Sequence, residues 1–284
     1  MESIYLGPMG RLMKIDIPSE GFTAVLTESG AEHLPLSGRR TKDVFNRRRE
    51  FEIPLDGLTP RALSWFEMLY TDAILGPFYL LDTSRLNRLR ARISSSGTAP
   101  ISSNANALDW ANPGAGPLTY ITATSVLLPN GAHFSSGPSR AVQWVPAAAN
   151  VLTDTAQIPV LPGEVITFSV YAQAGAPTLE IVPLNAVLAP QTPITGTVVI
   201  AGTPPRRYVT YTVPSNGTIV AVQVQIRAAA AGTFTTLAWM LNTGSTPADW
   251  TLGTGVPRVI LMAMDSNRQR VGNYTSSTVS LREV

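Results

Sequence analysis

The feature that most constrains the fold is an uneven distribution of charge along the chain. Residues 95–256 hold only four basic and five acidic side chains and are rich in glycine, proline, alanine and threonine. Residues 1–94 and 257–284 carry the remaining charges. Charged residues make up 14% of the chain, against roughly 25% in soluble proteins generally. This pattern predicts a discontinuous domain, built from residues 1–94 and 257–284, with residues 95–256 inserted as a second domain.

Hydrophobic residues alternate with polar ones in the middle of the chain, which is typical of half-buried β-strands. The clearest alternation covers residues 166–171, 220–227 and 237–241, where Leu237, Trp239 and Leu241 share one phase. Turn sequences such as Pro162-Gly163 and Asn216-Gly217 separate these segments. Short alternating strands at this spacing predict a jelly-roll β-sandwich for residues 95–256.

The flanking segments predict a smaller α+β domain, so the chain as a whole is expected to be mainly β. Its one helix is expected near residues 59–72, because Thr59 can cap a helix and Pro60 fits the first helical position. Residues 28–44 are polar and predict irregular structure. Strands are expected around residues 13–17, 22–26, 51–55, 78–81, 259–264 and 276–281. Pairing the last two with the earlier strands in one sheet would bury them.

Composition narrows the function classes. The chain has no cysteine, which excludes disulfides and thiolate metal sites, and we expect no metal site or cofactor. The N-terminus lacks the pattern of a signal peptide, and no apolar run approaches the roughly 18 residues of a membrane span. We therefore expect synthesis in a cytoplasm without membrane insertion.

The sequence does not favour catalysis. The histidines His33 and His133 lie far apart without a metal-ligand spacing around them. A glycosidase needs two carboxylates facing one cleft. The middle segment has five carboxylates, namely Asp109, Asp154, Glu164, Glu180 and Asp249. Glu164 lies in a predicted turn and Asp249 in a predicted loop, and we expect both to be solvated. We therefore expect that the protein is not an enzyme.

Two stretches resemble known families. Residues 59–87, with the run from Gly76 to Asp82 followed by Arg85 and Asn87, resemble the N-terminal domain of minor tail or distal tail proteins of long-tailed phages. Residues 162–171 and 237–250, with their Pro-Gly-Glu turn and Gly-Ser-Thr-Pro-Ala-Asp-Trp ending, resemble carbohydrate-binding-module sandwiches. The chain departs from that second family at Thr235 to Trp239, where no carboxylate occurs.

The first resemblance implies a structural component of a phage tail tip, assembled in the host cytoplasm and located in the virion. The discontinuous domain would form a homo-oligomeric, hexameric ring that contacts the tail tube protein and the tail-tip hub protein. Two basic runs, Arg39 to Lys42 and Arg47 to Arg49, are each followed directly by acidic residues, which favours subunit salt bridges or a solvated face over specific nucleic-acid binding.

The second resemblance implies that the sandwich binds host surface polysaccharide. Such sites stack sugar rings on aromatic faces and hold hydroxyl groups with amide or guanidinium groups. The residues that fit this chemistry are Tyr171, Gln223, Gln225, Arg227, Trp144 and Tyr208. Two alternatives stay open, namely a monomeric carbohydrate-binding-module protein and a sandwich that acts only as a spacer.

Overall fold

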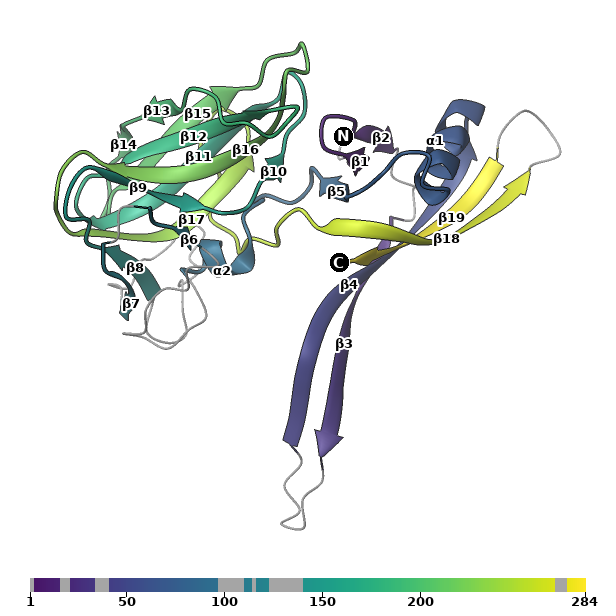
Figure 1. Cartoon of the computed structure of the whole chain (residues 1–284), viewed down its shortest axis with the longest axis horizontal. Helices are drawn as coiled ribbons and strands as arrows, with labels where there is room; N and C mark the ends of the chain where they lie inside the picture. The colour runs from purple at the N-terminus through teal and green to yellow at the C-terminus, as the bar shows by residue number, and fades with distance from the viewer. Residues whose placement is uncertain are drawn as a thin grey trace. The chain divides into compact units, whose positions relative to one another are not determined.

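The chain folds into two compact units (Figure 1). A computed structural model describes residues 3–15, 21–33, 41–96, 110–113, 116–122, 140–268 and 275–284. The first unit contains Met1–Asp82 and Pro257–Val284, and the second contains Thr83–Val256. Residues 83–94, which the charge pattern assigned to the first domain, belong to the second unit because Leu89 and Ile93 lie in its core.

The first unit is a β-sheet with one covering helix. Its strands follow the order β2-β1-β5-β18-β19-β4-β3, and neighbouring strands run antiparallel. The helix α1 (Pro60–Tyr70) begins at Thr59, whose hydroxyl accepts a hydrogen bond from the Ala62 N–H at 3.3 Å. The strands are β1 (Ile4–Pro8), β2 (Met13–Ile15), β3 (Thr23–His33), β4 (Thr41–Leu58), β5 (Phe78–Asp82), β18 (Arg258–Arg268) and β19 (Thr275–Glu283). The expected pairing of the C-terminal strands with the earlier ones is confirmed.

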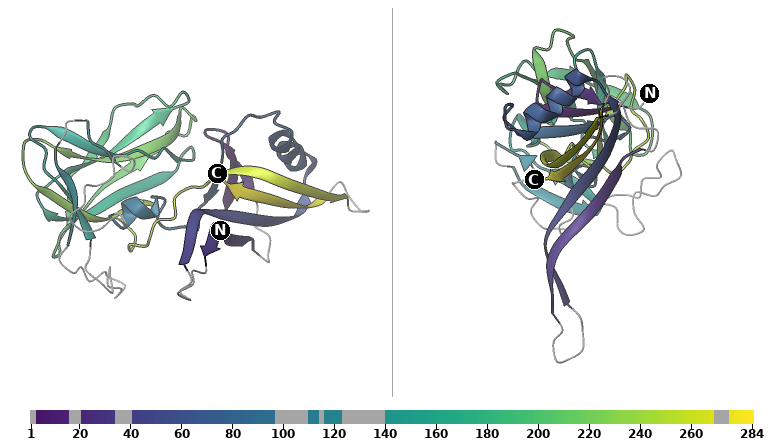
Figure 2. Two further views of the ribbon diagram at one scale, coloured as in Figure 1. Left: turned by 60° about the horizontal axis from the view of Figure 1, so that its bottom comes forward. Right: turned by 90° about the vertical axis from the view of Figure 1, so that its right-hand side faces the viewer.

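The long hairpin of β3 and β4 corrects the prediction of irregular structure for residues 28–44. The two strands pair from Thr23 opposite Glu52 to His33 opposite Thr41. Because β19 pairs with β4 only from Glu50 onward, the far part of the hairpin extends beyond the rest of this sheet (Figures 1 and 2). Acidic residues of β3 lie opposite basic residues of β4, and such cross-strand pairing leaves no hydrophobic alternation in the sequence.

The second unit is an antiparallel β-sandwich (Figure 2). One sheet, here the β16 sheet, has the order β13-β12-β16-β9-β6, with β10 beside β16. The other, the β11 sheet, has the order β14-β15-β11-β17-β8-β7. The elements are α2 (Ala91–Ser94), β6 (Trp110–Ala111), β7 (Leu118–Thr122), β8 (Arg140–Trp144), β9 (Asn150–Asp154), β10 (Ile158–Pro159), β11 (Val165–Ala174), β12 (Thr178–Asn185), β13 (Ile194–Gly196), β14 (Val198–Ile200), β15 (Arg206–Thr212), β16 (Ile219–Ala228) and β17 (Phe234–Thr243).

An aromatic cluster fills the space between the two sheets. The rings of Trp110 and Trp239 are 4.5 Å apart, and those of Phe168 and Trp239 are 5.3 Å apart. Buried aromatic side chains bring a large hydrophobic contribution per residue, so this cluster dominates the core. The prediction of a mainly β chain with a sandwich is confirmed.

Strand β17 contains a bulge that the alternation pattern did not reveal. Tyr171 lies opposite Leu237 and Ser169 lies opposite Met240, so β17 has one extra residue between these pairs. Ala238 occupies the left-handed region there, with φ 52°. Trp239 therefore faces the core while Leu237 packs with Tyr171 on the outer face, although the sequence places both in one phase.

The second unit is inserted between two neighbouring strands of the first. Strand β5 ends at Asp82, and the chain returns at Pro257 to form β18. These strands pair with each other, Phe78 lying opposite Val259. The whole sandwich therefore occupies the place of a loop that joins two antiparallel strands. Within the described residues, no helix is both long enough and apolar enough to span a bilayer.

Candidate functional site

The outer face of the β16 sheet brings three of the predicted glycan-binding residues together. On β16, Val222, Val224 and Ile226 face the core. Since successive side chains of a strand point to opposite faces, Gln223, Gln225 and Arg227 lie on the outer face. The strand register places two residues beside Gln225, namely Glu180 on β12 and Thr153 on β9.

These side chains form a continuous hydrogen-bonded row, here called the polar row (Thr153, Glu180, Gln225 and Arg227). The Arg227 Nε donates to Glu180 Oε1 at 2.5 Å, and its Nη2 donates to Glu180 Oε2 at 3.1 Å. The Gln225 Nε2 also donates to Glu180 Oε2, at 2.5 Å, while its Oε1 accepts from the Thr153 hydroxyl at 2.8 Å. Glu180 is only 1% exposed, so Arg227 and Gln225 enclose its carboxylate.

The exposed part of this site consists of Arg227 and Gln223. The Arg227 side chain is 44% exposed, and its Nη1 has no hydrogen bond to another described residue. The hydrogen bond to Glu180 raises the pKa of Arg227, so the guanidinium stays charged. Gln223 is half-buried two residues away on the same face. Together they offer the amide of Gln223 and the guanidinium of Arg227, which Glu180 holds in place, and such donors suit recognition of oxygen-rich ligands.

The remaining predicted residues lie elsewhere, so the six do not form one site. Tyr171 and Tyr208 lie on the outer face of the β11 sheet, on the opposite side of the sandwich from the polar row. Trp144 is fully buried in the core beside Phe234, and its indole N–H donates to Asn112 at 3.2 Å. The prediction that Trp144 contacts a glycan is therefore wrong, because its ring fills the interior.

A chain segment of the unit itself covers the outer face of the β11 sheet around Tyr171. This segment, residues 244–250, is here called the strap. Side chains on the sheet hold its backbone carbonyls: Arg206 Nη2 donates to Ala248 O at 2.7 Å, and Thr167 donates to Gly244 O at 2.7 Å. Trp250 packs against the cluster that contains Tyr171.

Tyr171 is consequently 7% exposed and serves an internal contact. The Arg206 guanidinium lies 5.3 Å from the centre of its ring, a cation–π geometry. Burial lowers the pKa of Arg206, although the nearby Tyr171 and Asp249 act in the opposite direction. Tyr208 is partly exposed and lies opposite Ser169. Of the two outer faces, only that of the β16 sheet presents its predicted residues as a group.

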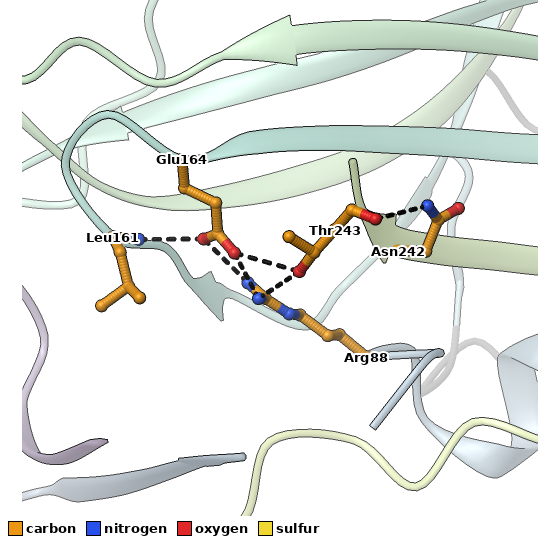
Figure 3. A network of polar contacts seen from close by, with 5 residues as sticks. All are labelled: Arg88, Leu161, Glu164, Asn242 and Thr243. Atoms are coloured by element: carbon orange, nitrogen blue, oxygen red, sulfur yellow. Dashed lines mark hydrogen bonds and ion pairs between the residues drawn. The ribbon is translucent and has the colours of Figure 1, made fainter. Parts of the chain in front are cut away.

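Glu164 corrects a second prediction. It was expected to be solvated in its turn, but it forms a buried ion pair with Arg88 (Figure 3). The two side chains are 6% and 1% exposed. Arg88 Nη1 donates to Glu164 Oε2 at 3.0 Å and Nη2 donates to the Thr243 hydroxyl at 2.7 Å, while Leu161 N donates to Glu164 Oε2 at 3.1 Å. This network fixes the segment before α2 to the sandwich.

Asn87 provides a second anchor in the same segment. Its amide nitrogen donates to Trp239 O at 3.1 Å and to Thr251 O at 2.8 Å, and its amide oxygen accepts from Leu89 N and Leu241 N. The cluster of arginines at residues 85–92, next to a nearly uncharged segment, was the only sequence signal for this role.

Several sequence predictions fall outside the described structure. Arg39, Arg40, Asp109 and His133 lie outside the described residues, as do the side chains of His33, Lys42 and Arg47. Of the other basic residues, Arg49 pairs with Glu283 at 2.8 Å and Arg282 pairs with Glu50 at 2.9 Å, both within the chain. Among the side chains that the structure describes, no three His, Asp or Glu groups are placed to hold a metal ion.

Comparison with protein families finds no matching family model, and comparison with curated proteins finds no similar sequence. Solved structures similar to part of the chain include the enzymatically active domain of tailspike protein 4 of bacteriophage CBA120, at 14% identity and a TM-score of 0.41, covering 56% of this chain and 22% of that one.

Two carbohydrate-binding modules are also similar. One is the C-terminal family 22 module of a Clostridium thermocellum xylanase, at 16% identity and a TM-score of 0.33, covering 49% of this chain and 87% of that one. The other is a family 61 module solved with β-1,4-galactotriose, at 9% identity and a TM-score of 0.32, covering 56% and 100%. This chain therefore spans about a fifth of the tailspike domain's chain and most or all of the two modules.

Proposed function

We propose that the protein is a structural component of the tail tip of a long-tailed phage and displays a β-sandwich that binds host surface glycans. The observation that best supports glycan binding is the polar row. A buried carboxylate holds the exposed Arg227, and a guanidinium fixed in this way can hydrogen-bond sugar hydroxyls without first losing side-chain freedom.

The way in which the sandwich is inserted supports display. The chain leaves the first unit after β5 and returns to it at β18. These two strands are neighbours in the first unit's sheet, so the sheet is continuous without the sandwich. A first unit that forms a homo-oligomeric, hexameric ring would present several copies of the polar row. Multivalent presentation strengthens weak sites without any new contact.

Binding fits the site better than catalysis does. Asp154, Glu164 and Glu180 each form an ion pair with an arginine, which leaves them unsuited to general acid–base roles in the free protein. In the proposed assembly, located in the virion, the ring contacts the tail tube protein and the tail-tip hub protein. Basic residues of β4 such as Arg49, which pairs with Glu283, are proposed to stabilise the first unit and not to bind nucleic acid.

Two measurements test the proposal. Native mass spectrometry of the full chain should show a hexamer, whereas a monomer in solution and in the virion would refute the ring. On a glycan array, the full chain should bind at least one host-surface polysaccharide, and Arg227→Ala should bind about tenfold more weakly, the loss of one charge-assisted contact. The control Arg92→Ala removes an exposed arginine of α2 and should bind normally.

The second candidate is a sandwich that acts as a spacer. The observation in its favour is that no aromatic side chain accompanies the polar row among the described residues of β12, β16 and β9. The spacer predicts that the assembled protein binds no host envelope fraction. A monomeric protein that still binds glycan would instead favour an isolated carbohydrate-binding function.

A further inference from the structure

We infer that Glu180 makes the polar row selective for uncharged glycans over acidic ones. The inference rests on the proposed glycan binding and adds the class of ligand that this site accepts. Glu180 acts here as a positioning residue, since its carboxylate is enclosed and does not reach a ligand.

Burial behind Arg227 and Gln225 keeps Glu180 from contacting a sugar. Both oxygens already accept bonds, one from Arg227 and the other from Arg227 and Gln225, and the side chain is 1% exposed. A ligand on this face therefore meets the outward edge of Arg227, which includes the free Nη1, and the amide of Gln223.

The charge of the site follows from the same geometry. Glu180 neutralises Arg227, and the other groups of the row, Gln225 and Thr153, are uncharged. The groups that the register places beside Arg227 on the outer face are Thr178 on β12 and Val151 on β9, which carry no further charge. Glu180, a few ångströms deeper, offsets most of the attraction that an acidic sugar would gain from the guanidinium, so the sugar carboxylate would lose hydration without an equal gain. A hydroxyl oxygen accepts the same hydrogen bonds at a smaller desolvation cost.

An isosteric substitution of Glu180 separates its role in orienting Arg227 from the effect of its negative charge. Glu180→Gln keeps the size of the side chain and one acceptor oxygen for Arg227 but removes the negative charge. The matched control is Asp249→Asn, which makes the same change in net charge at an exposed carboxylate of the strap. Both variants and the native full chain are assayed on one array of neutral and uronate-containing glycans, with circular dichroism to verify folding.

The native chain should prefer neutral glycans by at least about tenfold, and this binding should change less than about twofold between 50 and 500 mM salt, as expected where no net charge is neutralised. Glu180→Gln should raise the ratio of acidic to neutral binding about tenfold and make the acidic binding salt-sensitive, whereas Asp249→Asn should leave the ratio unchanged.

Each other outcome is decisive. A native chain that prefers acidic glycans overturns the inference while glycan binding stands. Neutral preference that persists in folded Glu180→Gln, or that shifts equally in Asp249→Asn, overturns the role of Glu180. Absence of glycan binding by the native hexamer overturns the proposed function and this inference with it. If Glu180→Gln does not fold, the salt response and preference of the native chain still decide the ligand class.

Discussion

Removal of Arg88 should destabilise the second unit strongly. The substitution Arg88→Met keeps most of the side-chain volume but leaves Glu164 without its cation at 6% exposure. Removing one partner of a buried ion pair costs about 3–5 kcal/mol, because the other charge remains buried and uncompensated. The Thr243 hydroxyl and the Leu161 N–H still reach Glu164, which places the expected loss at the lower end, about 3 kcal/mol.

Replacing both partners should restore much of this loss. In Arg88→Met combined with Glu164→Gln, no buried charge remains, and we expect the double variant to lie within about 1–2 kcal/mol of the native chain. The strong non-additivity of the two substitutions is the signature of a direct interaction between the two groups.

Intrinsic tryptophan fluorescence is a suitable assay, because only Trp65 of the five tryptophans belongs to the first unit. A loss of 3 kcal/mol should lower the melting temperature of the second unit by about 6–12 °C. The control Arg92→Met, at an exposed arginine of α2, should change stability by less than about 0.5 kcal/mol. The reasoning is refuted if Arg88→Met lowers the free energy of unfolding by less than about 1 kcal/mol, or by no more than the double variant does.

Other substitutions test separate parts of the structure. Asn87→Ala should cost about 2–3 kcal/mol in urea unfolding, because it leaves buried backbone groups of β17 unpaired. Trp250→Ala should make the strap susceptible to limited proteolysis, since it removes the strap's contact with the cluster around Tyr171; an unchanged digestion pattern would contradict this. Thr59→Ala should destabilise the first unit by about 1 kcal/mol, whereas Thr59→Ser should not. Burial raises the pKa of Tyr79 above its ordinary 10.0. The unfolded state therefore loses this proton first, stability should fall as pH rises above about 10, and Tyr79→Phe should reduce that fall.

Local patterns predicted three central strands of the second unit, β11, β16 and β17. On β11 and β16, the alternation identified both the strands and the residues that face the core, because the period of two is a property of the strand itself. The helix α1 was equally predictable, since its capping residue Thr59 and its first residue Pro60 are adjacent in sequence. Strands were predicted at residues 22–26 and 51–55, but the polar part of the β3–β4 hairpin within residues 28–44 was missed, because cross-strand pairing there leaves no hydrophobic alternation.

The site was harder to predict from the sequence than the fold. Gln223, Gln225 and Arg227 were recognisable as an outer-face set on one strand, but Glu180 lies 45 residues from Gln225 in sequence and meets it only through the register of β12 and β16. The alternation on β11 predicted that Tyr171 lies on an outer face, just as the alternation on β16 did for Gln225. Nothing in the local pattern showed that the strap covers Tyr171, because the contacts of the strap depend on the packing of distant segments.

The uneven charge distribution, by itself, established that this chain has a nearly uncharged middle between charged ends, and the alternation established which faces of β11 and β16 are buried. Both are local consequences of hydrophobic burial and strand periodicity. Tertiary structure alone decided which polar groups are available. It buried Glu164 against Arg88, placed Trp144 in the core and enclosed Glu180 within the polar row. Strand order and register bring these groups together across long sequence separations, and the free energy of those contacts exists only once the sheets have paired.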